Sequence, residues 1–143
     1  MIEIKLGDRN IPLFYSTYES IAINRDIGCT AFQLQDEVFG VERDDEDDPM
    51  SIRLTVTTDP VKTEKLGKLI RILGNAGLEE DGKEADLTDK WVLRHMRPMQ
   101  IMSYALITMA VIHEGNRTEV QTNENEVVDE GLEEQMAKKQ PGS

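Results

Sequence analysis

Cysteine, histidine and clustered carboxylates are the side chains of this sequence that could take part in catalysis or bind a metal ion. The one cysteine, Cys29, follows Gly28 and has no basic residue close beside it, so nothing nearby favours its reactive thiolate form. We interpret it as a small residue in a turn between helices, in a chain suited to a reducing compartment. His95 and His113 are far apart and, with a single cysteine, do not make up a zinc site.

The carboxylates are most concentrated in residues 42–48, which read Glu-Arg-Asp-Asp-Glu-Asp-Asp. This run lacks the alternating ligand spacing, the central glycine and the distal glutamate of a calcium-binding loop. A calcium-binding loop counted with Gly82 as its central glycine would have Gly77 at the first ligand position and Thr88 at the last. Neither residue supplies a carboxylate. We expect both stretches to be solvated loops without a metal ion.

Sequence motifs of common enzymes are missing from the chain. It has no glycine-rich phosphate loop, no GxSxG and no HExxH. We therefore predict that the protein is not an enzyme and needs no cofactor. Its 143 residues fit one domain, and its formal net charge of −12 repels phosphate backbones, so we expect no nucleic-acid partner. An acidic surface that mimics DNA and occupies a basic protein stays open as an alternative.

No segment of the sequence favours a membrane. The N-terminus lacks a basic start followed by an apolar run, so no signal peptide is expected. The most apolar stretch, residues 99–112, is interrupted by polar residues and is shorter than the roughly 20 residues that cross a bilayer.

Methionine is the more informative residue type. On the helix predicted after Pro98, Met99, Met102 and Met109 share a face less than a quarter-turn wide at about 100° per residue, and Leu106 lies at its edge. Methionine is flexible and polarizable, so such a face adapts to varied apolar helices and is a candidate partner-binding site. Ordinary core packing is the alternative interpretation of the same pattern.

Residues 116–143 are polar and acidic and contain no aromatic residue, which is typical of a flexible tail. Within this tail Val128, Leu132 and Met136 are four residues apart, with acidic residues between them. Such a segment forms only a marginal helix alone, but it could fold as an amphipathic helix on a partner. A plain flexible linker is the open alternative.

The N-terminal residues predict a β-hairpin. Ile2, Ile4 and Leu6 alternate with polar residues, and residues 7–10 form a polar turn with a glycine. A second short strand follows with Ile11, Leu13 and Phe14, and Pro12 restricts that strand to a sheet edge.

The rest of the chain predicts helices. Capping boxes start helices at Ser16 and at Thr30, which should end at the glycines of positions 28 and 40. Residues 52–58 suggest a third strand or an extended segment. Asp59 and Pro60 start a helix with a buried face, which should end near Gly74 or Gly77. That buried face comprises Leu66, Leu69, Ile70 and Leu73.

A short helix is expected from Asp86 or Thr88, and the helix after Pro98 should end near Gly115. That last helix is apolar on nearly all sides, so it should be central in the core or covered by a partner. We therefore predict a mainly α fold. Residues 1–115 form a small helical domain with an N-terminal β-hairpin, and residues 116–143 form a disordered acidic tail.

The order of these features resembles the tail assembly chaperones of long-tailed bacteriophages and related prophages. The resemblance rests on the hairpin EIKLGDRNIPLF, the helix start YSTYESIAINRDIG, a helical body and a polar acidic C-terminus, and it covers residues 1–115 in layout. It implies binding and solubilisation of the tape-measure protein, and help in recruiting tail-tube subunits. It also implies action in the host bacterial cytoplasm and absence from the mature virion.

The resemblance leaves other roles open. The main alternative is a structural virion protein of the tail or the head–tail joint. By resemblance the partners are the tape-measure and tail-tube proteins, and homo-oligomer formation stays open. The candidate partner-binding residues are Met99, Met102, Leu106, Met109, Val128, Leu132 and Met136.

Overall fold

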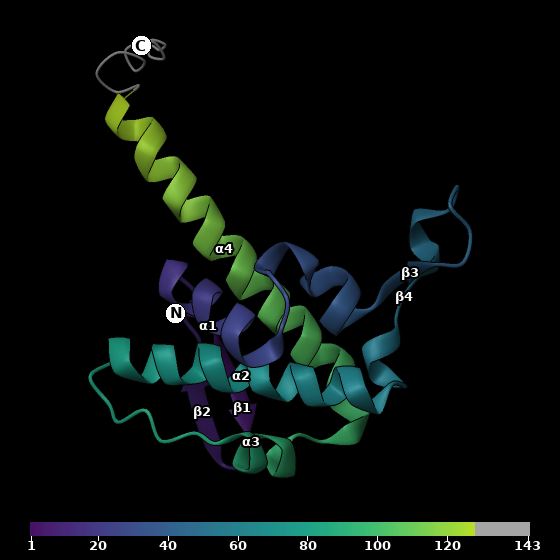
Figure 1. Ribbon diagram of the computed structural model, residues 1–143, viewed down its shortest axis with the longest axis horizontal. Helices are drawn as coiled ribbons and strands as arrows, with labels where there is room; N and C mark the ends of the chain where they lie inside the picture. The colour runs from purple at the N-terminus through teal and green to yellow at the C-terminus, as the bar shows by residue number, and fades with distance from the viewer. Residues whose placement is uncertain (128–143) are drawn as a thin grey trace. The chain divides into compact units, whose positions relative to one another are not determined.

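The computed structural model describes the backbone of residues 1–127 and the side chains of residues 1–117. These residues are mainly helical and begin with a short β-hairpin, which confirms the predicted fold class (Figure 1). The chain divides into one compact unit, Met1–Val111, and a second that begins at Ile112. The predicted boundary between residues 115 and 116 stays a prediction. Val128, Leu132 and Met136 lie outside the described residues.

The N-terminal hairpin forms as predicted. Strands β1 (Glu3–Leu6) and β2 (Arg9–Pro12) are antiparallel, and Leu6 pairs with Arg9 across a two-residue turn. The first residue of this turn is a glycine with a φ of 60°, a conformation that side chains with a Cβ rarely adopt. Ile4, Leu6 and Ile11 are fully buried, so the alternation of the sequence places one face of the hairpin in the core.

Helix α1 (Thr17–Ile27) begins and ends at the predicted caps. The hydroxyl of Ser16 accepts a hydrogen bond from the backbone N–H of Tyr18 and donates one to the carboxylate of Glu19. Gly28 ends the helix in the left-handed conformation, with a φ of 92°.

The second predicted helix forms in two short pieces rather than as an α-helix. A 3₁₀ turn (Ala31–Gln33) is followed by a π-helical turn (Gln35–Phe39), which ends at Gly40. Leu34, Val38 and Phe39 are all buried. The wider π turn explains this burial, because residues four and five positions apart then share one side.

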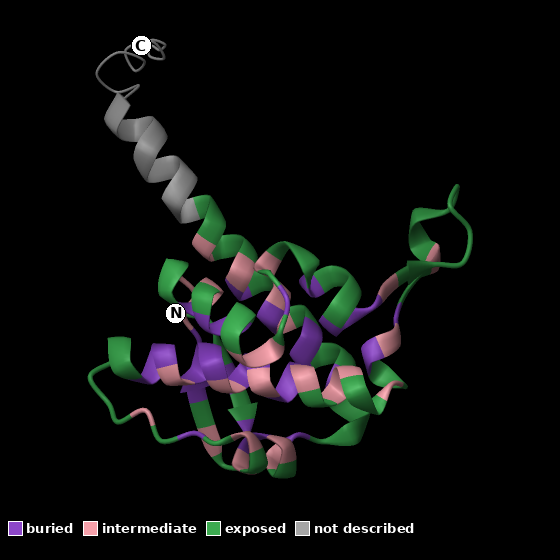
Figure 2. Ribbon diagram, in the orientation of Figure 1, coloured by how far each residue is buried: buried purple, intermediate pink, exposed green. Residues whose placement is uncertain are grey.

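Residues 42–48 are exposed, as predicted, but they belong to a second hairpin that we did not predict (Figure 2). Strand β3 (Val41–Arg43) pairs with β4 (Ile52–Leu54), and a 3₁₀ turn (Pro49–Ser51) lies in the loop between them. Arg53 is 3.0 Å from both Glu42 and Asp44 and offsets part of their repulsion. The expected strand or extended segment of residues 52–58 is therefore β4, followed by another 3₁₀ turn (Thr55–Thr57).

Helix α2 (Pro60–Glu80) is the centre of the first unit. The Asp59 side chain accepts from the Val61 N–H, which confirms the predicted start. The buried face is also confirmed, because Leu66, Leu69, Ile70 and Leu73 are all fully buried.

The predicted end of α2 near Gly74 or Gly77 is wrong, because the helix continues to Glu80. These glycines are contact positions and not caps. A Cβ on Gly77 would lie 1.9 Å from the carbonyl oxygen of Pro12, and one on Gly74 would lie 2.6 Å from Leu87 Cδ1. Without side chains at these positions, β2 and the segment before the next helix pack directly on the α2 backbone.

Two further helices complete the described chain. Helix α3 (Asp89–His95) starts at the predicted cap Thr88, whose hydroxyl accepts from the Trp91 N–H. A 3₁₀ turn (Pro98–Gln100) then leads into α4 (Ile101–Val127).

The predicted end of this last helix near Gly115 is wrong. The backbone stays helical through Gly115 to Val127. A glycine inside a helix costs about 1 kcal/mol but does not by itself stop it.

Candidate functional site

One face of α4 is buried in the first unit, and the opposite face is presented to solvent. The buried face comprises Ile101, Tyr104, Ala105, Thr108 and Val111. Its two polar side chains are satisfied. The Tyr104 hydroxyl accepts from the Arg97 N–H at 2.9 Å and donates to Gln100, and the Thr108 hydroxyl donates to the Ala105 carbonyl at 2.8 Å. Because these bonds and contacts fix the rotation of the helix, they also fix which side chains face outward.

The outward side contains the face predicted from methionine spacing, here called the Met face: Met99, Met102, Leu106 and Met109. Met99 is 95% exposed, Met102 44% and Leu106 52%, whereas Met109 is partly buried at the border. Of the two alternatives predicted for this helix, a central place in the core does not fit these exposures, so core packing does not explain Met99, Met102 and Leu106. Cover by a partner stays a prediction. Met96, by contrast, is a core residue. Partner binding by the Met face stays a prediction.

An open apolar depression adjoins the first turn of the Met face. Pro98 and Ile101, which directly precede Met99 and Met102 in the chain, line one part of it. Leu93 of α3, Thr57 and Thr58, and the first turns of α2 line the rest, and Glu64 is the one carboxylate in the lining.

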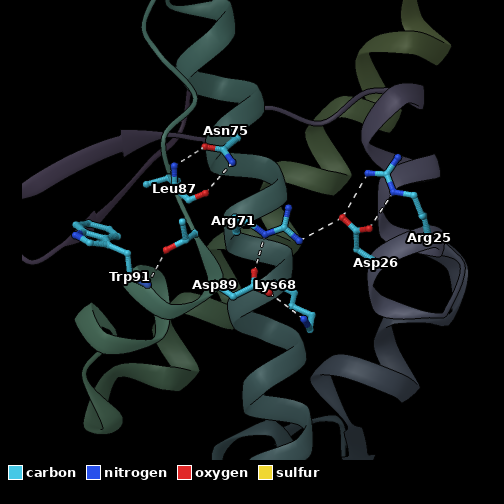
Figure 3. A network of polar contacts seen from close by, with 9 residues as sticks. Arg25, Asp26, Lys68, Arg71, Asn75, Leu87, Asp89 and Trp91 are labelled. Carbon is cyan, nitrogen blue, oxygen red and sulfur yellow. Dashed lines mark hydrogen bonds and ion pairs between the residues drawn. The ribbon is translucent and has the colours of Figure 1, made fainter.

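A network of polar contacts holds α3 in place (Figure 3). Arg71 of α2 donates to Asp89 at the start of α3 and also lies 3.2 Å from Asp26 of α1, while Lys68 is 2.9 Å from Asp89. Burial raises the pKa of Asp89, but hydrogen bonds from Lys68 and Arg71 outweigh it, so the pKa lies below its ordinary value. The hydrogen bond from Arg25 is the largest cause of the lowered pKa of Asp26.

The chain entering α3 is held by a second set of contacts in the same network. The side chain of Asn75 accepts from the backbone N–H of Leu87 at 2.9 Å and donates to its carbonyl at 3.2 Å (Figure 3). These two bonds satisfy the backbone N–H and carbonyl of Leu87, which lies outside any helix or strand and lacks the backbone partners of those elements. Together with the cap at Thr88, they fix the position from which α3 starts.

Three exposed cations lie on α3 and just after it: Lys90, Arg94 and Arg97, here called the basic corner. Among residues 1–117, no ion pair uses any of these side chains, although most other cations there are paired. We did not predict this feature from the sequence. Its signal was present, because the twenty-four residues from Lys90 to His113 contain no aspartate or glutamate in a chain of net charge −12.

The remaining candidates for chemistry are accounted for by the fold. Cys29 is buried, and this burial raises the pKa of its thiol, so the reactive thiolate is disfavoured. The buried carboxylate of Glu19 accepts the Ser16 hydroxyl at the α1 cap. Over the part of the chain whose side chains are described, no three His, Cys, Asp or Glu residues come close enough together to hold a metal ion.

Within the described part of the chain, none of the helices has the length and apolar character needed to span a bilayer. The site as described thus consists of exposed apolar side chains on α4 and on the 3₁₀ turn before it, with three unpaired cations on α3 and just after it. Comparison with family models, with curated proteins and with solved structures gave no match to this chain.

Proposed function

We propose that this protein is a tail assembly chaperone of a long-tailed bacteriophage or prophage, which keeps the tape-measure protein soluble through its Met face and helps recruit tail-tube subunits. The observation that carries the proposal is the exposure of Met99, Met102 and Leu106 at helical spacing on a strongly acidic protein. Exposed apolar side chains that gather on one helix face mark an interaction surface. Methionine suits a surface that must accept many different apolar segments of one long client.

The size of the Met face suits transient binding. Covering Met99 fully and the exposed halves of Met102 and Leu106 contributes roughly 4 kcal/mol, at about 1.5–3 kcal/mol for a fully buried apolar side chain. Association costs offset much of this, so a single contact is weak and readily reversed. A chaperone that must release its client to the growing tail tube needs this kind of contact, and its acidic surface keeps the complex in solution.

A pair of methionine variants tests the proposal. Met102→Asp places a charge in the Met face, and Met50→Asp makes the same change at a methionine that is 87% exposed in the loop of the second hairpin. Because Met102 is 44% exposed, both variants should fold, which thermal unfolding followed by circular dichroism would check. Each variant is then co-expressed with a tape-measure protein from the same phage or prophage, and the soluble fraction of that client is measured.

We expect Met102→Asp to lower the soluble fraction of the client, whereas Met50→Asp should match the wild type. A folded Met102→Asp variant that keeps the client as soluble as the wild type does would remove the Met face from the proposal. The role as a chaperone is tested separately by mass spectrometry of purified particles. A chaperone should be missing from them, while a structural tail protein or head–tail joining protein would be present in fixed copy number.

A further inference from the structure

The charges of this chain are separated along its sequence in a complementary way. The basic corner lies in a stretch, residues 90–113, that has three cations and no carboxylate. Residues 118–137 have the opposite composition, with seven carboxylates and no cation. In a chain with 28 acidic and 16 basic residues, both stretches depart strongly from the average mixture.

The apolar residues of these two stretches are also complementary. Val128, Leu132 and Met136 fall on one side of the C-terminal segment if it is helical, and Asp129 and three glutamates lie between them. The Met face offers an exposed apolar strip of similar helical spacing, and the basic corner directly precedes it in the chain. An acidic amphipathic helix therefore matches this surface in both apolar pattern and charge.

We infer that the C-terminal segment of a second copy of this chain, residues 128–136, docks on the Met face with its carboxylates toward the basic corner. Two copies exchange these segments reciprocally and form a symmetric dimer. The carboxylates of the docked segment lie along α3 and the turn before α4, away from Glu64 in the depression, which would repel them.

Docking of this kind goes beyond the proposed function, since it needs no client. It would keep the Met face covered until a client displaces the segment. Ion pairs at exposed cations contribute only about 0.2–1 kcal/mol each, so they select the partner and the orientation more than they add affinity. The dimer should therefore weaken as salt is raised to about 1 M, where charges are screened beyond roughly 3 Å.

Charge reversal on each side of the contact tests the inference in the full-length chain. One variant carries Arg94→Glu with Arg97→Glu, and the other carries Glu133→Lys with Glu134→Lys. A control carries Lys5→Glu with Arg43→Glu, which changes two exposed cations outside the Met face and the basic corner and alters the net charge as the first variant does. Sedimentation velocity over a series of protein concentrations gives the mass, and circular dichroism shows that each variant is folded.

The wild type and the control should reach the mass of a dimer as concentration rises, and raising the salt concentration should weaken this association. Each reversed variant alone should stay monomeric, because positions 94 and 97 and positions 133 and 134 then carry charges of the same sign. An equimolar mixture of the two reversed variants should recover the dimer, since in both contacts between unlike copies positions 94 and 97 then face opposite charges at positions 133 and 134.

Three results would overturn the inference. The first is a monomeric wild type at all concentrations in low salt, which includes the case in which the segment docks on its own chain. The second is a dimer that survives both reversals. The third is a mixture that fails to associate. The assay contains no tape-measure protein, and Arg94 and Arg97 lie outside the Met face, so failure here leaves the chaperone proposal standing and its failure leaves this inference standing.

Discussion

Gly77 of α2 gives a sharp test of how the hairpin packs on the helix. In Gly77→Ala the new Cβ would lie 1.9 Å from the carbonyl oxygen of Pro12 and 2.3 Å from its carbonyl carbon. Both neighbours are backbone atoms and cannot rotate away. Restoring an ordinary contact of about 3.4 Å requires the β2 backbone to move by roughly 1.5 Å, a shift that packed interiors resist.

That movement would disturb the residues on both sides of Pro12. Ile11 and Leu13 are buried, and the next residue, Phe14, donates its backbone N–H to the Leu73 carbonyl at 3.0 Å. Overpacking costs about 1–3 kcal/mol or more. Helix propensity alone would make the alanine variant about 1 kcal/mol more stable than the wild type. A loss of stability would therefore come from packing. Because the clash is with backbone atoms, we use the upper end of the overpacking range and expect a net loss of about 2 kcal/mol in the free energy of unfolding.

Urea unfolding followed by circular dichroism would measure this loss, with Gly67→Ala as the matched control in the same helix. There the new Cβ meets only the Leu93 side chain, 2.5 Å from its Cδ2, and that side chain can adopt another rotamer. The control should therefore lose less stability than Gly77→Ala. A Gly77→Ala protein as stable as the wild type, or less affected than Gly67→Ala, would refute the placement of β2 on α2.

Two further predictions concern α2 and its contacts. Leu69→Ala should cost about 2–5 kcal/mol in urea unfolding because Leu69 is fully buried, whereas Lys65→Ala, which removes a 3.7 Å surface ion pair, should cost under about 0.5 kcal/mol; equal costs would mean that the buried face is misassigned. The pKa of Asp89 is lower in the folded protein than in the unfolded chain, where it is about 3.9. The stability that this difference contributes is fully present above the unfolded pKa. It is lost as pH falls through the folded pKa, because the carboxylate is then protonated and no longer forms charged bonds to Lys68 and Arg71. Asp89→Asn should therefore unfold more easily at neutral pH and show a flatter fall in stability below about pH 4; a pH dependence parallel to that of the wild type would contradict this assignment.

Helix starts and buried helix faces could be predicted from the sequence because their signals are local. The cap residues Ser16, Asp59 and Thr88 bond to backbone groups two or three residues away, and each one starts a helix. The buried stripe of α2 repeats within one helix. A short window of sequence contains all of this information.

Helix ends and strand pairing depended on distant residues and could not be predicted in the same way. Whether Gly77 stops a helix or admits another segment depends on Pro12, which is remote in sequence. The acidic run of residues 42–48 gave a correct prediction of exposure, but its repulsion masked the pairing of Glu42 with Arg53 across the second hairpin. The 3₁₀ and π turns of residues 31–39 likewise follow from packing, because their capping signals also suit an α-helix.

The candidate site shows the same limit in a different form. Methionine spacing predicted which residues share the Met face, but residue type alone ranks them as core. The structure instead buries Thr108, whose hydroxyl bonds to the Ala105 carbonyl, and exposes Met99. Thr108, whose hydroxyl is hydrogen-bonded, and the small side chain of Ala105 fit the close contact between α4 and the core. The longer methionine and leucine side chains then face solvent.

The anchoring of α3 has a consequence for the entropy of binding. Asp89 is fixed by two cations of α2, and the backbone before it is fixed by Asn75, so the short helix that carries Lys90 and Arg94 starts from a rigid base. A partner that pairs with these cations need not immobilise a mobile backbone and loses only the freedom of the side chains, at about 0.5–1.5 kcal/mol each. Loosening Asp89 would therefore weaken recognition at the basic corner without altering a single residue that the partner touches.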